Sequence, residues 1–138
     1  MKPAQLFLAN ALTFISALMP ISAEEDSPAA IQMKHIGKGF KTLSTQISDP
    51  TKKESSLKTI DAMLLAVNAS KPLIPAPAGE LKGDSLKTYM REYAKGLSEL
   101  EASLQDLKKA VAAGDTSAAQ NLLSAINKLK KTYHSDLR

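Results

Sequence analysis

The stretch that decides the fold is DSLKTYMREYAKGLSELEASLQDLKKAVAAG, residues 84–114. Its apolar residues recur at intervals of four and three, which places them along one side of an α-helix. This is also the spacing of the seam along which helices pack in a left-handed bundle. We therefore expect a long helix that begins at the N-cap Asp84 and ends at Ala113-Gly114, with the glycine as C-terminal cap. The seam consists of Leu86, Met90, Tyr93, Leu97, Leu100, Leu104, Leu107 and Val111.

Three further segments carry the same spacing. The first opens at Ser27-Pro28, a capping residue followed by a proline suited to the first helical turn, and ends at Asp49-Pro50. The second runs from about Thr51 to Ser70 and is stopped by Pro72, and the fourth opens at Asp115. Their apolar residues are Met33, Ile36, Phe40, Leu43 and Ile47 in the first, Leu57, Ile60, Leu64 and Val67 in the second, and Ala119, Leu122, Ile126, Leu129 and Tyr133 in the fourth.

These segments predict an all-α fold. No single helix can bury its own seam, so four helices of similar length should pack together. The first and third connections are short, whereas residues 72–83 hold three prolines and two glycines and form a loop. Short connections favour antiparallel neighbours. We therefore expect residues 24–138 to form one antiparallel up-down-up-down four-helix bundle.

The first 23 residues have the layout of a secretory signal peptide. Lys2 gives a positive start, an apolar run extends from Leu6 to Ile21, and Ser22-Ala23 precedes a group of acidic residues. The alternative is a membrane anchor. A spanning helix needs about 20 consecutive apolar residues, and this run is shorter and interrupted. We expect export and cleavage after about Ala23.

Composition excludes several classes of function. The chain has no cysteine, so it can form neither disulfides, nor thiolate metal sites, nor covalent haem links. The formal net charge is +4 and falls to +3 when Lys2 is removed with the signal peptide. No basic patch is interleaved with aromatic residues, so nucleic-acid binding is not expected. No nucleophile elbow, phosphate loop or paired carboxylates are found, and we expect that the protein is not an enzyme.

Two residues suited to binding iron fall at matched depths in this topology. The first helix starts, and the last helix ends, at the same end of the bundle. Met33 and His134 each lie roughly 6–8 Å from their helix ends, taking 1.5 Å per residue. His134 lies within about 20° of Leu123 at 100° per residue, which places it beside the seam. Taken alone, a Met on a helical stripe is usually core and a His near a chain end is usually solvated.

The C-terminal run LKKTYHSDLR, residues 129–138, resembles the haem-binding end of the cytochrome b562 family. That family closes with Tyr-His, two further residues, an aromatic and an Arg. Residues 33–43 resemble its first helix, with Met33 in the ligand position. The second and third helices also fit, through Leu57, Ile60, Pro72, Tyr93 and Leu97. The sequence departs from the family at Leu97 and Leu137, which stand where aromatic residues are expected.

The resemblance implies a haem protein that transfers electrons in the bacterial periplasm. Met33 and His134 would be the axial ligands of one non-covalent haem b (iron protoporphyrin IX) per chain. The related cytochromes c′ attach haem through Cys-x-x-Cys-His, and here only the histidine of that motif is present, at His134. A Met/His pair leaves no iron position open, which favours electron transfer over substrate chemistry. We expect these residues near the cofactor: Ile36, Gly37, Phe40, Pro72, Tyr93, Leu97, Lys130 and Arg138.

Two other functions remain open on the sequence. Leu97 and Leu137 weaken the aromatic wall, and a bundle without haem could serve as a periplasmic binding or adaptor protein. A Met/His copper site would need further ligands, and the sequence offers only Met90 and His35. Of these two, we expect His35 to be exposed. For either haem protein or adaptor we expect protein partners, no membrane contact after cleavage, and a monomer or weak dimer.

The signal peptide gives the first testable prediction. Protein recovered from the periplasmic fraction of an expressing bacterium should begin at Glu24-Glu25-Asp26 when its N-terminus is sequenced. Material that keeps Met1 and sediments with the membrane would instead identify residues 6–21 as an anchor.

Overall fold

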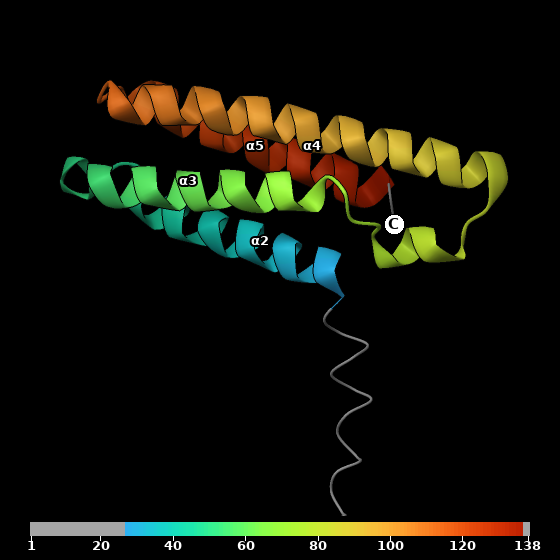
Figure 1. Ribbon diagram of the computed structural model, residues 1–138. Coiled ribbons are helices and arrows are strands. Elements are labelled where there is room, and N and C mark those ends of the chain that lie inside the picture. The colour runs from blue at the N-terminus through green and yellow to red at the C-terminus, as the bar shows by residue number, and fades with distance from the viewer. Residues whose placement is uncertain (1–26, 137–138) are drawn as a thin grey trace, which may run out of the picture.

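The computed structural model of the protein describes the backbone of residues 27–136 and the side chains of residues 27–132 (Figure 1). The expected signal peptide, residues 1–23, and the residues Leu137 and Arg138 lie outside the described part.

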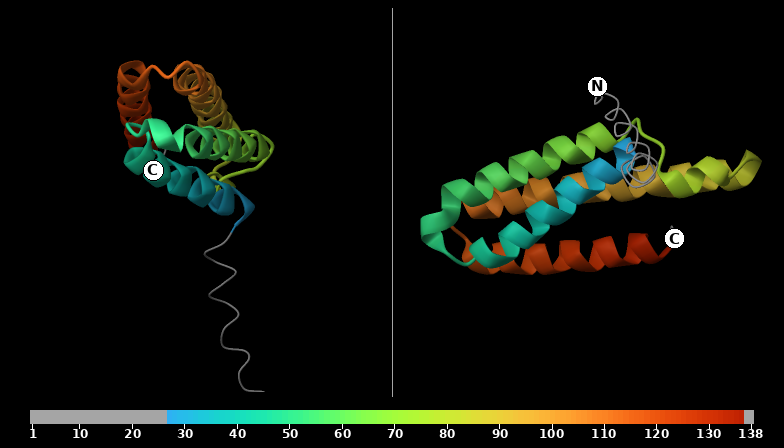
Figure 2. Two further views of the ribbon diagram at one scale, coloured as in Figure 1. Left: turned by 90° about the vertical axis from the view of Figure 1, so that its left-hand side faces the viewer. Right: turned by 90° about the horizontal axis from the view of Figure 1, so that it is seen from below.

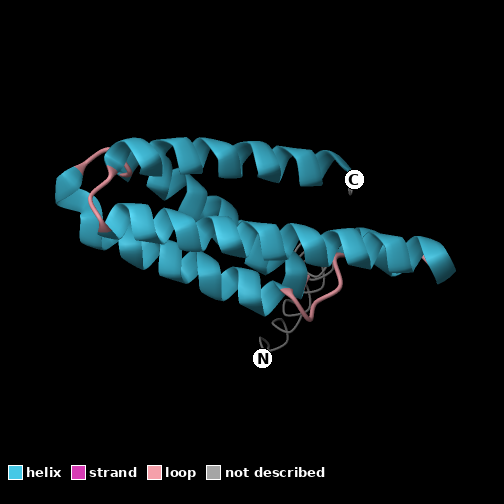
Figure 3. Cartoon of the chain, turned by 90° about the horizontal axis from the view of Figure 1, so that it is seen from above, coloured by secondary structure: helices cyan, strands magenta, loops and turns pink. Residues whose placement is uncertain are grey.

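Four helices make up most of the described chain. They are α2 (Pro28–Gln46), α3 (Lys53–Ser70), α4 (Gly83–Ala112) and α5 (Thr116–Asp136). Two short 3-10 turns, η1 (Pro50–Lys52) and η2 (Ala76–Glu80), lie in the connections. The helices run antiparallel, with two short turns at one end and the long connection at the other (Figure 3). No strand occurs between residues 27 and 136. The predicted all-α four-helix bundle is confirmed.

Side-chain and glycine caps end the helices where the sequence places them. The Ser27 hydroxyl accepts a hydrogen bond from the Ala30 amide at 3.2 Å, and Asp115 Oδ1 accepts one from the Ala118 amide at 3.0 Å. Gly114 takes a left-handed φ of 74°, which a glycine adopts without steric cost. The Asp115 amide then donates to the Ala110 carbonyl at 2.9 Å, which closes the end of α4.

Two boundaries differ from the sequence-based prediction. Helix α4 begins at Gly83, after an extended Lys82 that makes no side-chain cap, so Asp84 is not the N-cap. Asp84 instead lies in the first turn, where its charge interacts favourably with the helix dipole. The second boundary is the start of α3, which lies at Lys53 rather than near Thr51. The residues before it form η1 instead, whose N-cap Asp49 accepts a hydrogen bond from the Thr51 amide at 2.9 Å.

The core follows the predicted seams with one exception. Met33 lies on the seam of α2, yet its side chain is 40% exposed. Met63 and Ala66 on α3, which are outside the predicted seam, are buried instead. The buried core cluster consists of Ile36, Phe40, Leu43, Ile60, Met63, Ala66, Val67, Tyr93, Leu97, Leu104, Leu107, Val111, Ala119, Leu123 and Ile126.

Helices α2 and α3 approach each other most closely at Gly39. A Cβ added to Gly39 would lie 2.7 Å from Met63 Sδ and would also clash with Met63 Cγ. Met63 is 1% exposed and fixed in the core, so it has little room to give way. A glycine at position 39 therefore lets the fully buried Met63 pack against the backbone of α2.

Close backbone contact is extensive only between consecutive helices in the described part of the chain: α2 with α3, α3 with α4, and α4 with α5. Helices α2 and α5 are neighbours in the bundle but approach less closely. They lie nearest beside the short turns and diverge toward the start of α2 and the end of α5 (Figure 2). None of the described helices is long and apolar enough to cross a membrane.

The close approach at Gly39 predicts opposite effects for two glycine substitutions in α2. Gly39→Ala should lower the free energy of unfolding by about 1–3 kcal/mol, because the added methyl overpacks the core against Met63. Gly37→Ala should raise it by up to about 1 kcal/mol, because its methyl meets nothing within 4 Å and alanine favours the helix. Urea unfolding of the haem-free protein measures both. A Gly39→Ala variant as stable as Gly37→Ala would contradict the packing at this contact.

Candidate functional site

Met33 is a large apolar side chain that the bundle leaves partly uncovered. It lies in the second turn of α2, at the end where α2 and α5 diverge (Figure 2). Its side chain is 40% exposed, whereas Ile36, on the same seam and three residues later, is 4% exposed. A thioether is a soft donor that gains little from hydration. Its place at the open end of the seam makes it available to a bound group.

His134 is reached by the last turns of α5, which extends to Asp136. Its side chain lies outside the described residues, so only its helical position is known. It follows Lys130 by four residues and therefore by about one turn. Because α2 begins and α5 ends at the same end of the bundle, Met33 and His134 belong to that end, as the topology predicts.

Lys130 and Phe40 join α5 to α2. The Lys130 amine lies 5.1 Å from the centre of the Phe40 ring, within the range of a cation–π interaction. Phe40 follows Met33 by about two turns, and Lys130 precedes His134 by one. The contact therefore lies one to two helical turns farther from that end of the bundle than the two candidate ligands. The sequence places both residues near the cofactor but does not predict their interaction with each other.

Gly37 lies one turn after Met33 on α2. A Cβ built on this glycine would meet nothing within 4 Å, so the space beside the helix is open there. The two glycines of α2 thus differ in their surroundings. Met63 fills the space beside Gly39, whereas the space beside Gly37 is open. A flat group could approach the α2 backbone at Gly37 without displacing a side chain.

The remaining predicted contacts fall into two sets. Ile36, Phe40, Tyr93 and Leu97 are buried in the core. Pro72 is exposed in the turn after α3, and Lys130 is exposed on α5. The first set can exclude water from a bound group, whereas Pro72 and Lys130 lie at the surface. Arg138 lies outside the described residues.

Tyr93 links the end of α3 to α4. Its hydroxyl donates a hydrogen bond to the Ser70 carbonyl at 3.2 Å, inside the core. Burial raises the pKa of Tyr93 above its ordinary value of 10.0, more than the hydrogen bond to Ser70 lowers it. The phenol is therefore neutral at physiological pH and fixed in position.

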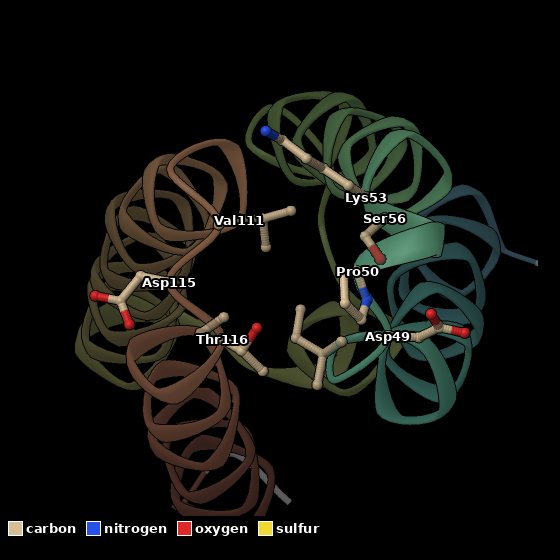
Figure 4. A pocket seen from close by; sticks show the side chains of 10 residues that line it. Asp49, Pro50, Lys53, Ser56, Val111, Asp115 and Thr116 are labelled. Carbon is tan, nitrogen blue, oxygen red and sulfur yellow. The ribbon is translucent and has the colours of Figure 1, made fainter.

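Two hollows on the surface do not include the candidate ligand Met33. One, of about 70 Å³, lies between the two short turns and is lined by residues that include Asp49, Ser56, Val111 and Thr116 (Figure 4). The other, of about 560 Å³, runs along the outer side of α2 and α3 past His35. Among the described residues, neither lining includes Met33, Phe40 or Lys130. The candidate site is thus marked by its donors and by the open side of Gly37, not by either hollow.

His35 is exposed, as its spacing from Met33 predicts. It lines the outer hollow together with Lys38 and faces away from the α2–α5 side. The described residues contain no group of three or more His, Cys, Asp or Glu side chains that could hold a metal ion.

The comparisons with known proteins single out one family. A family model described as cytochrome b562 matches residues 30–138, which span all four helices and both candidate ligands. No curated protein and no solved structure gives a match to the chain.

The raised pKa of Tyr93 predicts how stability changes in alkali. A phenol whose pKa is higher in the folded protein stabilises the fold below its unfolded pKa of about 10, and this stabilisation is lost as pH rises through the folded value. The free energy of unfolding should therefore fall above pH 10 in the wild type and fall less steeply in Tyr93→Phe. At neutral pH the variant should be less stable by about 0.5–1.5 kcal/mol, since the Ser70 carbonyl loses its donor. Tyr89→Phe is the comparison for ionisation alone. It should also make the alkaline fall in the free energy of unfolding less steep, because burial raises the pKa of Tyr89, but it leaves the donor to the Ser70 carbonyl in place. Identical alkaline profiles for wild type and Tyr93→Phe would exclude this role.

Proposed function

Because the chain belongs to the cytochrome b562 family, whose members are haem-binding electron-transfer proteins, we propose that it carries single electrons in the periplasm through one non-covalent haem b with Met33 and His134 as axial ligands. The observation that carries the proposal is the exposed Met33 thioether, next to the open side of Gly37, at the end of the bundle where α5 brings His134. The absence of cysteine from the sequence supports a haem that is not covalently attached.

The residues present fit a haem. The two ligand types, a thioether and an imidazole, suit iron and come from helices that diverge at the site. The side of α2 at Gly37 accepts a flat group without displacing a side chain. Ile36, Phe40, Tyr93 and Leu97 supply an apolar, water-excluding wall. Iron held by such a pair changes between two oxidation states without needing a free coordination position.

The protein's own residues would set how the group is held. The four buried side chains keep the surroundings dry, and a Met/His pair in dry surroundings favours the reduced state. Lys130, freed from Phe40, and Arg138 would pair with the propionates at the edge. With Met33 and His134 both holding the iron, no position would remain open to a substrate, and we propose that the protein is not an enzyme.

The remaining parts of the proposal concern location and partners. Members of the family are typically periplasmic, and residues 1–23 supply the signal peptide that would export this chain. We propose that the mature protein is a monomer or weak dimer that meets other redox proteins, without binding nucleic acid or membrane.

A second function is favoured by one observation. Leu97 is buried where the family has an aromatic residue, so the wall of the site offers less stacking. A haem-free binding or adaptor protein would keep the same bundle. It would show no change in stability when hemin is added.

Spectroscopy of the mature protein with hemin tests the ligand pair. The wild type should give the sharp bands of six-coordinate low-spin haem, oxidised and reduced. Met33→Ala and His134→Ala should convert these to high-spin bands or lose them, because one donor is gone. His35→Ala is the matched control and should leave the spectrum unchanged, since His35 is exposed on another side of α2. A spectrum of free hemin in the wild type would reject the cofactor and leave the adaptor function.

A second measurement tests the edge of the site. Lys130→Ala should weaken hemin binding about two- to fivefold, since a partly exposed ion pair contributes up to about 1 kcal/mol. Lys128→Ala removes the same charge two residues earlier and should change the affinity less than twofold. Competition for hemin with a haem-accepting apoprotein gives both values. Equal losses in the two variants would show that only the total charge matters.

A further inference from the structure

The charges of the protein are divided unequally between its helices. Within residues 28–46 and 116–132, helices α2 and α5 carry six lysines and no carboxylate. Helices α3 and α4 carry seven basic and seven acidic residues. The positive charge of the described chain is therefore concentrated on the two helices that bear Met33 and His134. The lysines are Lys34, Lys38 and Lys41 on α2 and Lys128, Lys130 and Lys131 on α5.

All six lysines are exposed, and the helices that carry them, α2 and α5, are adjacent in the bundle (Figure 2). We call these six lysines the lysine face. Lys130 lies over the Phe40 ring, and Lys38 also lines the outer hollow. Lys41 follows Phe40, and Lys131 follows Lys130, the two residues that meet at 5.1 Å. Lys41 and Lys131 therefore flank the junction of the two helices. The carboxylates that flank the two helices along the chain are Asp49 and Asp115, beside the short turns at the far end of the bundle, and Glu24, Glu25, Asp26 and Asp136, which are outside the described side chains.

The other side of the bundle is neutralised internally. Lys71 pairs with Glu101 and Lys108 pairs with Asp61, each at 2.7 Å, and both pairs connect α3 or its end to α4. The Lys71 ammonium lowers the pKa of Glu101 through their hydrogen bond, which keeps this carboxylate charged. Within residues 28–46 and 116–132, α2 and α5 carry no carboxylate that balances the lysines of the lysine face. Its charges add to a field that reaches about 10 Å into solvent at 0.1 M salt.

We propose that the lysine face is the docking surface for the acidic surface of a redox protein partner. This inference rests on the proposed function, because the partner would be attracted to the two helices that would hold the haem. Complementary charge speeds encounter and orients the two proteins before they touch. An acidic partner drawn to Lys41 and Lys131 would meet this protein at the junction of α2 and α5.

The surface suits a protein better than other polyanions. Phe40 is the one aromatic among the described side chains of α2 and α5, and it is buried, so the face has no stacking platform for bases. Among the described large apolar residues of α2 and α5 only Ile31 and Met33 are exposed, so the two helices present no broad apolar side to a lipid surface.

Oxidation of the reduced holoprotein by small reagents of opposite charge measures the field at the site. At about 10 mM ionic strength, anionic ferricyanide should react about tenfold faster than at about 300 mM, and cationic tris(phenanthroline)cobalt(III) should react more slowly. Stopped-flow absorbance follows both reactions. The double variant Lys41→Glu/Lys131→Glu should lose or invert this salt dependence.

The control is Lys87→Glu/Lys95→Glu, which makes the same change of charge on α4. It should keep most of the wild-type salt dependence. Equal effects of the two double variants would overturn the proposal, because only the net charge would then matter. A wild-type rate that does not depend on salt would overturn it as well.

Binding of an acidic protein tests the surface independently of haem. Amide shifts of the labelled chain, titrated with an acidic flavodoxin at low salt, should change along α2 and α5 and remain unchanged along the outer side of α4. Changes produced by phosphatidylglycerol vesicles but not by the flavodoxin would replace the protein partner with a membrane. This titration needs no redox activity. Failure to bind hemin would therefore reject the proposed function without deciding the docking surface, and absent shifts with a normal haem spectrum would reject only the docking surface.

Discussion

The packing of Met63 against the backbone of α2 at Gly39 governs the arrangement of the bundle. Without a side chain at position 39, α2 lies close to α3 and its seam is sealed on that side. Because α2 leans toward α3, it leaves α5 at the end where α2 begins. The same geometry accounts for the two unusual features of α2: Met33 is exposed although it lies on a seam, and the space beside Gly37 is open. A tight contact on one side of a helix thus creates the opening on the other.

The opposite side of α2 is held differently. There the described contact is a cation over a ring, Lys130 on Phe40, which is weaker and more easily exchanged than core packing. Together with the exposed lysines around it, this gives α2 and α5 a junction that is positive and adaptable. The α3–α4 side is instead joined by ion pairs such as Lys108 with Asp61. The bundle is therefore joined by ion pairs and balanced in charge on one side, and open and positively charged on the other.

The fold could be predicted from the sequence because local signals decide it. The apolar spacing of residues 84–114, the cap at Ser27 and the glycine at 114 fixed four helices to within a few residues. The role of Gly39 could not be predicted, because it depends on Met63, a residue distant in sequence and outside the seam of α3. For the candidate site, the sequence predicted that the positions of Met33 and His134 share one end of the bundle. It could not predict the contact of Lys130 with Phe40, because pairing across helices depends on how far α2 and α5 diverge.

The exposure of Met33 has a chemical consequence for the protein before any cofactor is bound. A thioether that is 40% open to solvent can be oxidised to the sulfoxide, which turns a soft sulfur donor into a polar, hydrogen-bonding group. Met63, only 1% exposed, is protected by the core. The same side chain that suits a ligand is thus the methionine that peroxide reaches more readily while the site is uncovered. Early occupation of the site by a cofactor would shield this sulfur, so the speed of loading would decide how much of the protein stays chemically intact.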